Sequence, residues 1–119
     1  MTLLTSNHIA VLADLHWTAP GTSLAKGQQE LPDKDHAPTF WGQVAAAFKD
    51  NPLVIFELFN EPFPGGGGAK AKNWETWAGK TPSSKWAGQA QLISAIRKTG
   101  APNVIRECTW LGSVSFCDT

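Results

Sequence analysis

LVIFELFNEP, residues 53–62, is a continuous apolar run that carries one charge before it ends in polar residues. An apolar run of this length without alternation is typical of a strand buried on both faces of a parallel sheet. Asn60, Glu61 and Pro62 end the run. The sequence therefore predicts a buried strand over residues 53–59, with an amide and a carboxyl group at its carboxyl end.

A second run of the same kind lies upstream, where residues 9–13 read IAVLA. It leads into Asp14, Leu15, His16 and Trp17, so this strand also turns polar at its carboxyl end. A buried strand is predicted here for the same reason.

Helices are predicted between and after these strands. Pro38 opens a helical pattern with Phe40, Val44 and Phe48 on one face, and the pair at 51–52, Asn-Pro, stops it. A second helix is expected after a cap at Ser83 or Ser84, with Trp86, Ile93 and Ile96 facing inward and Gly100 ending it.

The rest of the chain is predicted to be loop, apart from a third strand that starts at residues 103–105. Residues 18–37 and 64–82 are rich in polar residues, Gly and Pro and show no periodicity, which indicates two long surface loops. Residues 107–119 show no assignable pattern. The predicted order is βαβαβ followed by an undefined tail.

Strands separated by helices pair in parallel through right-handed crossovers. The carboxyl ends of parallel strands meet at one edge of the sheet, where ligands and reactions collect in such folds. We therefore expect His16 and Glu61 to lie near one another at that edge.

Composition limits the classes of partner. The 119 residues, 42% of them hydrophobic, fit one domain over 1–119, and ten basic and ten acidic residues cancel. A neutral chain without a basic cluster favours neither nucleic acid nor an anionic membrane. No apolar run approaches the roughly 20 residues that span a bilayer, and the first four residues lack the features of a signal peptide.

Cysteine and histidine spacing offers no metal or redox motif. Cys108 and Cys117 lack the Cys-x-x-Cys spacing, and a disulfide between them is left open. His8, Asp33 and Asp35 have no ligand spacing either, so no metal is expected. Six Trp in so short a chain exceed what packing usually needs, and some are expected to face a ligand.

The motifs resemble those of glycoside hydrolase family 5, the endoglucanase-type cellulases of the (β/α)8 barrel class. VLADLHW at 11–17 resembles the family's third-strand motif, and FELFNEP at 56–62 resembles its fourth-strand signature. Several such motifs in the right order are more specific than any one of them. Past Ile105 the chain departs from the family pattern, and residues 110–112 resemble it only weakly. The other similar segments are DKDH at 33–36, FW at 40–41, NP at 51–52, GQ at 88–89, IR at 96–97, TGA at 99–101 and NVI at 103–105.

The resemblance implies a fold and a reaction. The fold is α/β, a parallel βαβαβ fragment of a (β/α)8 TIM barrel that covers about the third to fifth strands. Glu61 would be the general acid/base of a retaining glycosidase, which needs a second carboxyl group about 5 to 5.5 Å away as nucleophile. That nucleophile belongs to the family's seventh strand and is expected outside this chain. The family acts without a metal or other cofactor.

The resemblance also implies contacts with the sugar. Asn60 would bind the sugar 2-hydroxyl group, His16 would line the same subsite, and His36 would be a further contact. Stacking of sugar rings on indole is expected first of Trp17, which follows His16, and of the predicted loop pair Trp74 and Trp77.

Three other carboxylates are considered as partners of Glu61. Glu57 lies four residues earlier on the same strand, roughly 13 Å away at about 3.3 Å per residue, so a buried structural role is predicted for it. Asp14 shares the side of the strand that carries His16, but at a depth that also indicates a structural role. Glu107 is the remaining candidate, although the family places no nucleophile there.

Three functions stay open: a cellulase-like hydrolase acting on β-glucan or a related polysaccharide, a sugar-binding module without turnover, and an inactive truncated remnant. A three-strand fragment leaves sheet edges and apolar faces unpaired, so copies of the chain are predicted to associate and complete a barrel. Family members are usually secreted, yet no export signal is present, so the localisation is undecided.

Overall fold

The computed structural model describes residues 1–66, 70–111 and 114–118, with three parallel strands at its centre. β1 spans Val11–Asp14, β2 spans Val54–Glu57 and β3 spans Ile105–Leu111. β2 lies between the other two and pairs in parallel with both. The predicted parallel βαβαβ order is confirmed.

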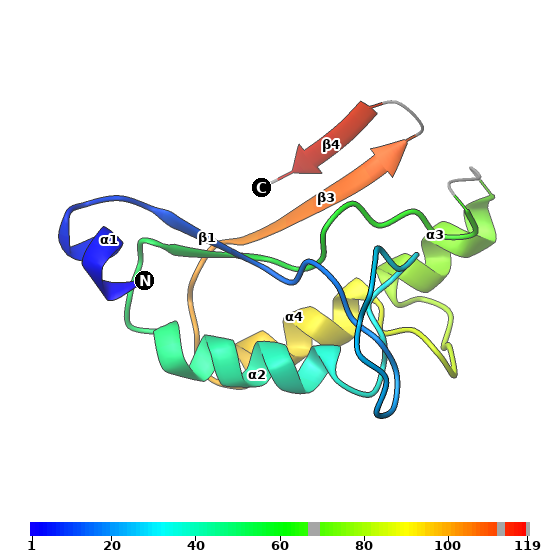
Figure 1. Cartoon of the computed structure of the whole chain (residues 1–119), viewed down its shortest axis with the longest axis horizontal. Helices are drawn as coiled ribbons and strands as arrows, with labels where there is room; N and C mark the ends of the chain where they lie inside the picture. The colour runs from blue at the N-terminus through cyan, green and yellow to red at the C-terminus, as the bar shows by residue number, and fades with distance from the viewer. Residues whose placement is uncertain (67–69, 112–113, 119) are drawn as a thin grey trace.

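Two helices supply the crossovers. α2, Ala37–Phe48, follows β1, and α4, Gln89–Arg97, follows β2. Figure 1 shows them packed side by side on one face of the strands. A short α1, Thr2–Ser6, precedes β1 and lies apart from this layer.

Side chains of the central strand fill the space between sheet and helices. Val54 and Phe56 of β2 and Leu58, which follows it, alternate along the chain and are fully buried. Trp41 of α2 packs on Phe56 with ring centroids 5.5 Å apart, and its indole N–H donates to the Leu58 carbonyl at 3.0 Å. Trp41 is therefore a core residue, and the pairing of its only polar group removes the cost of burying it.

The opposite face of the sheet carries two rows of side chains. Register places Asp14, Glu57 and Arg106 side by side across the three strands. One pleat away, Leu12 lies beside Ile55 and is 41% exposed. This face combines a charged row, near the carboxyl edge, with a partly exposed apolar row.

The second predicted loop contains a helix that the sequence analysis missed. α3, Ala71–Ala78, lies within residues 64–82 and ends at Gly79, whose φ of 83° suits glycine. The chain then passes close to itself, because a Cβ on Gly88 would meet the Gly79 Cα at 2.6 Å. These two glycines permit the contact between α3 and the start of α4.

The start of the last helix was also predicted too early. The Ser83 hydroxyl accepts the backbone N–H groups of Lys85 and Trp86, as a cap would. The helix itself begins at Gln89, and Trp86 instead forms an isolated bridge with Asp33. The serine signal marked a turn rather than a helix start.

The tail without a predicted pattern forms a hairpin. β3 continues to Leu111 and pairs in antiparallel with β4, Val114–Asp118. Cys108 and Cys117 occupy opposite positions of this ladder, but their side chains lie outside the described part of the structure, as does Gly112. No helix in the described ranges is long and apolar enough to cross a membrane.

Candidate active site

The polar ends of β1 and β2 meet at one edge of the sheet. The Leu15 N–H donates to the Glu57 carbonyl at 3.4 Å, and the Asn60 N–H donates to the Leu15 carbonyl at 3.1 Å. His16 and Glu61 are the next residues after this bonded pair. The expected convergence of the two strand ends is therefore present in the backbone.

Glu61 occupies an unusual backbone conformation. Its φ is 40°, in the left-handed region that residues other than glycine adopt rarely, and the following Pro62 restricts it further. Such strain collects at functional sites and persists only where the surroundings enforce it. Glu61 is exposed, so no packing of its own side chain holds this conformation.

His16 is held by a carboxylate on its own strand. Its Nδ1 lies 2.6 Å from the Asp14 Oδ2. Since an ionised carboxylate only accepts, Nδ1 donates, and Nε2 is left as the nitrogen available to a ligand. The His16 ring, 60% exposed, also meets the Trp17 ring with centroids 5.7 Å apart. Asp14 orients an exposed imidazole next to an indole.

The charged row gives Glu57 a distinct electrostatic environment. Burial raises the pKa of the Glu57 carboxyl above its usual range, and the Asp14 carboxylate raises it further. Arg106 and His16 act in the opposite direction. Glu57 is thus a buried carboxyl group that lies near the Asp14 carboxylate and the Arg106 guanidinium group. Its burial agrees with the structural role predicted for it.

Glu107 points to the other side of the sheet. It follows Arg106 on β3 and so faces away from the charged row. Its carboxylate accepts a hydrogen bond from the side chain of Gln89, the first residue of α4. Glu107 is therefore directed at the helix layer and is a poor candidate for the partner of Glu61.

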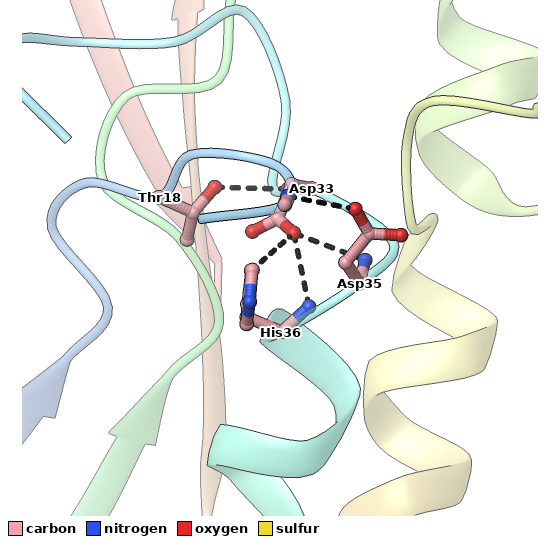
Figure 2. A network of polar contacts seen from close by, with 5 residues as sticks. Thr18, Asp33, Asp35 and His36 are labelled. Atoms are coloured by element: carbon pink, nitrogen blue, oxygen red, sulfur yellow. Dashed lines mark hydrogen bonds and ion pairs between the residues drawn. The ribbon is translucent and has the colours of Figure 1, made fainter. Parts of the chain in front are cut away.

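His36 belongs to a separate polar network, built on a fully buried carboxylate. Figure 2 shows Thr18, Asp33, Asp35 and His36 converging at the start of α2. The Asp33 Oδ1 accepts the backbone N–H groups of Asp35 and His36 and the His36 Nδ1–H, at 2.9 to 3.0 Å. The Thr18 hydroxyl accepts the Asp33 N–H at 2.9 Å. This network holds the turn that leads into α2 and orients His36.

A cavity of about 370 Å³ adjoins that network. Trp17 and His36 both line it, and Trp17 is 46% exposed. Because Trp17 also packs against His16, this indole links the cavity to the sheet edge. The cavity walls include Leu15, Thr18, Thr22, Ser23 and Phe40.

The predicted tryptophan pair lies on α3 rather than on a loop. Trp77 is only 2% exposed and belongs to the core, so its ring offers no face to a sugar, contrary to the prediction. Trp74 is half-buried and packs against the same core. The helix that carries them was missed although Trp74, Trp77 and Ala78 are spaced as on one helical face, and the stacking predicted for Trp74 stays a prediction.

Sequence reasoning missed two residues that touch the Asn60–Glu61 turn. Gln28 exchanges hydrogen bonds with Asn60, and Glu30 bonds two N–H groups beyond it, at Phe63 and Gly65. Both lie in the loop between β1 and α2, where no periodicity or motif signals a contact 32 or more residues away.

Comparison with known proteins finds one matching family and similar solved structures. The family model described as cellulase (glycosyl hydrolase family 5) matches residues 1–117. The structure of XacCel5A in complex with cellopentaose is similar, with a TM-score of 0.50 and 33% identity, over 85% of this chain and 27% of that one. A second crystal structure of XacCel5A gives the same values. The chain thus spans about a quarter of the length of the solved protein it resembles.

Proposed function

Because the chain belongs to glycosyl hydrolase family 5, we propose that it carries the acid/base part of a glycosidase active site that hydrolyses β-1,4-linked glucan. Glu61 is the general acid/base, and Asn60 and His16 bind the sugar at the cleavage point. The observation that carries the proposal is the pairing of Asn60 with Leu15, which sets the Asn-Glu turn beside His16 at the carboxyl edge of the sheet.

The strained turn supports this assignment. A non-glycine residue at a φ of 40° immediately before proline is costly, by about 1 to 3 kcal/mol for a residue held in a sparsely populated region. A turn that only ends a strand can form without such a strained residue. A turn that must aim a carboxyl group at a substrate accounts for it.

The sugar path runs from the sheet edge towards the cavity lined by Trp17 and His36. Trp17 offers a partly exposed indole face for stacking, and His36, fixed by Asp33, offers its Nε2 to a hydroxyl group. Trp74 retains a partly exposed ring and is an outer contact. Cellopentaose, the ligand solved with XacCel5A, is the natural probe for this path.

A retaining reaction also needs a second carboxylate at about 5 to 5.5 Å from Glu61. Asp14 is bonded to His16, Glu107 faces α4, and Glu57 is buried in the charged row. We propose that the nucleophile is supplied from outside residues 1–119 or by a second copy of the chain.

Hydrolysis tests the proposal. We would measure release of sugar from carboxymethyl-cellulose and of dye from a chromogenic cellobioside, with Glu61→Gln purified identically to expose any contaminating cellulase. Activity that is lost in the variant supports a working site completed by another carboxylate. Equal activity in both proteins would show that the hydrolysis does not depend on Glu61 and would contradict the proposal that this chain hydrolyses the substrate through that residue.

A sugar-binding module is the second candidate. It is favoured by the cavity beside Trp17 and by the engagement of Asp14, Glu57 and Glu107 with other groups. Calorimetric binding of cellopentaose without any product would support binding alone. Neither binding nor a cooperative melting transition would leave the inactive remnant as the remaining interpretation.

Association of copies remains part of the proposal. On the face opposite the helices, Leu12 is 41% exposed, and Val104, which immediately precedes β3, is 50% exposed. Burying such a row stabilises association. Size-exclusion chromatography with light scattering should show a dimer or larger species, and a stable monomer at high concentration would contradict it.

A further inference from the structure

The turn that carries Asn60 and Glu61 is clasped by a short piece of the preceding loop. The Gln28 Nε2 donates to the Asn60 carbonyl at 2.5 Å, and the Asn60 Nδ2 donates to the Gln28 Oε1 at 3.0 Å. Two residues later, the Glu30 carbonyl accepts the Phe63 N–H at 3.0 Å. The Glu30 carboxylate accepts the Gly65 N–H, also at 3.0 Å. Four hydrogen bonds thus bracket Glu61 from both sides.

These bonds fix which way the Asn60 side chain faces. A backbone carbonyl can only accept, so the Gln28 nitrogen must lie on the side of the Asn60 carbonyl. Its oxygen then lies on the side of the Asn60 side chain, which must present its Nδ2 to it. One N–H of Asn60 is committed to Gln28, and the Oδ1 and the other N–H are left for a ligand.

The same clasp explains how Glu61 keeps a positive φ. Strained backbone persists only where neighbouring contacts over-determine it. The Asn60 N–H and carbonyl are tied to Leu15 and Gln28 on one side of Glu61, and Glu30 ties the chain on the other side. Glu61 itself is exposed, so these backbone contacts rather than packing of its side chain hold the turn.

We infer that Gln28 is a positioning residue that sets the orientation of the Asn60 amide, and that Glu30 joins it in holding the Glu61 turn. The inference goes beyond the proposed function, and it rests on that function only for the claim that Asn60 meets the sugar. Gln28 need not touch the substrate, because it acts through Asn60.

Nuclear magnetic resonance of the 15N-labelled full chain tests the orientation without any ligand. In the wild-type chain the two Asn60 side-chain protons should resonate far apart, since only one of them is bonded to Gln28. Gln28→Ala should bring them together and speed their exchange with water. Gln29→Ala is the matched control, because Gln29 contributes only its backbone carbonyl to this region. Unchanged Asn60 resonances in Gln28→Ala would overturn the inference.

Binding of cellopentaose then separates positioning from a general structural effect. Gln28→Ala should weaken the Kd about tenfold, as expected for one lost hydrogen bond in a ligand site. If Gln28 acts through the Asn60 side chain, the double variant Gln28→Ala/Asn60→Ala should lose clearly less affinity than the sum of the two single losses, since only the bond to the residue 60 carbonyl remains to be lost in Asn60→Ala. Additive losses would overturn the positioning role.

Two further outcomes keep the test decisive. If Gln28→Ala does not fold, Gln28→Glu replaces it, because a carboxylate keeps the acceptor for Asn60 and removes the donor to its carbonyl; the Asn60 resonances should again shift. If the wild-type chain binds no cellopentaose, the proposed function fails. The Asn60 resonances then decide the inference alone.

Discussion

Two Asp–His pairs flank the loop that leaves β1, and they are built in opposite ways. In Asp33–His36 the carboxylate is fully buried and accepts three N–H groups. In Asp14–His16 the carboxylate is 24% exposed and the imidazole 60% exposed, with one short bond of 2.6 Å between them. The sequences Asp-x-His and Asp-x-x-His look alike, but their surroundings differ.

The difference in burial indicates different roles: the Asp33–His36 pair stabilises the fold, and the Asp14–His16 pair is available to a ligand. The Asp33 side chain is fully buried and accepts the N–H groups of Asp35 and His36 and the His36 ring N–H, so its loss would leave three donors without their acceptor at the turn that leads into α2. Asp14 touches His16 and the charged row, and its loss would change the orientation and charge of one edge. We therefore expect Asp33 to govern stability and Asp14 to govern binding.

The largest effect is expected for Asp33→Ala. It removes the acceptor of the Asp35 and His36 N–H groups at the turn before α2, so we expect a loss of about 2 to 3 kcal/mol in the free energy of unfolding. Urea denaturation measures it. Asp35→Ala, which removes an exposed acceptor of the Gly21 N–H, is the control and should cost less than about 1 kcal/mol. Equal costs would erase the distinction between the two pairs.

The next effect is expected for Asp14→Asn. The exposed pair contributes at most about 1 kcal/mol to stability, so the melting temperature should move little. Binding of cellopentaose should weaken several-fold, because His16 loses the group that fixes its Nδ1 as donor. Titration calorimetry measures the affinity, with His8→Ala as a histidine control outside the sheet edge. A large loss of stability with unchanged affinity would reverse the assignment.

The smallest effect concerns Glu57, the neighbour of Asp14 in the charged row. Burial and the Asp14 carboxylate raise the pKa of Glu57, so the native state disfavours its ionised form. The stability that Glu57 contributes is fully present below its unfolded pKa of about 4.5 and is lost as pH rises through the raised native pKa. Relative to Glu57→Gln, the wild-type chain should therefore be more stable near pH 4 than near pH 7.

Denaturant titrations of both proteins across that range provide the measurement. Glu75→Gln, an exposed carboxyl on α3, controls for the loss of one charge. A wild-type advantage that grows with pH would contradict the direction given for Glu57.

The sequence predicted those parts of the fold whose signals are local. The apolar runs that lead to His16 and Glu61 form β1 and β2, although the face of β1 that carries Leu12 is partly exposed rather than buried as predicted, and Pro38 and Pro52 lie near the two ends of α2. The strand ends therefore converge as expected. A continuous apolar run needs no knowledge of distant residues to be recognised.

The remaining features depend on contacts between distant residues. α3 is an exception, because Trp74, Trp77 and Ala78 share one helical face and Gly79 follows its last residue, so a local signal was present in the sequence. The clasp of Gln28 and Glu30 joins two polar loops across more than 30 residues. The positive φ of Glu61 depends on those bonds, and a glutamate at this position gives no local signal for a left-handed conformation.

The most direct test of the account is a titration of the 15N-labelled chain with cellopentaose, followed by chemical-shift mapping. We predict saturable shifts at His16, Trp17, Asn60 and Glu61, reaching His36 across the cavity, with α1 unchanged. Absence of shifts at saturating sugar, or shifts confined to residues away from the carboxyl edge of the sheet, would contradict the claim that this edge is a sugar-binding active site.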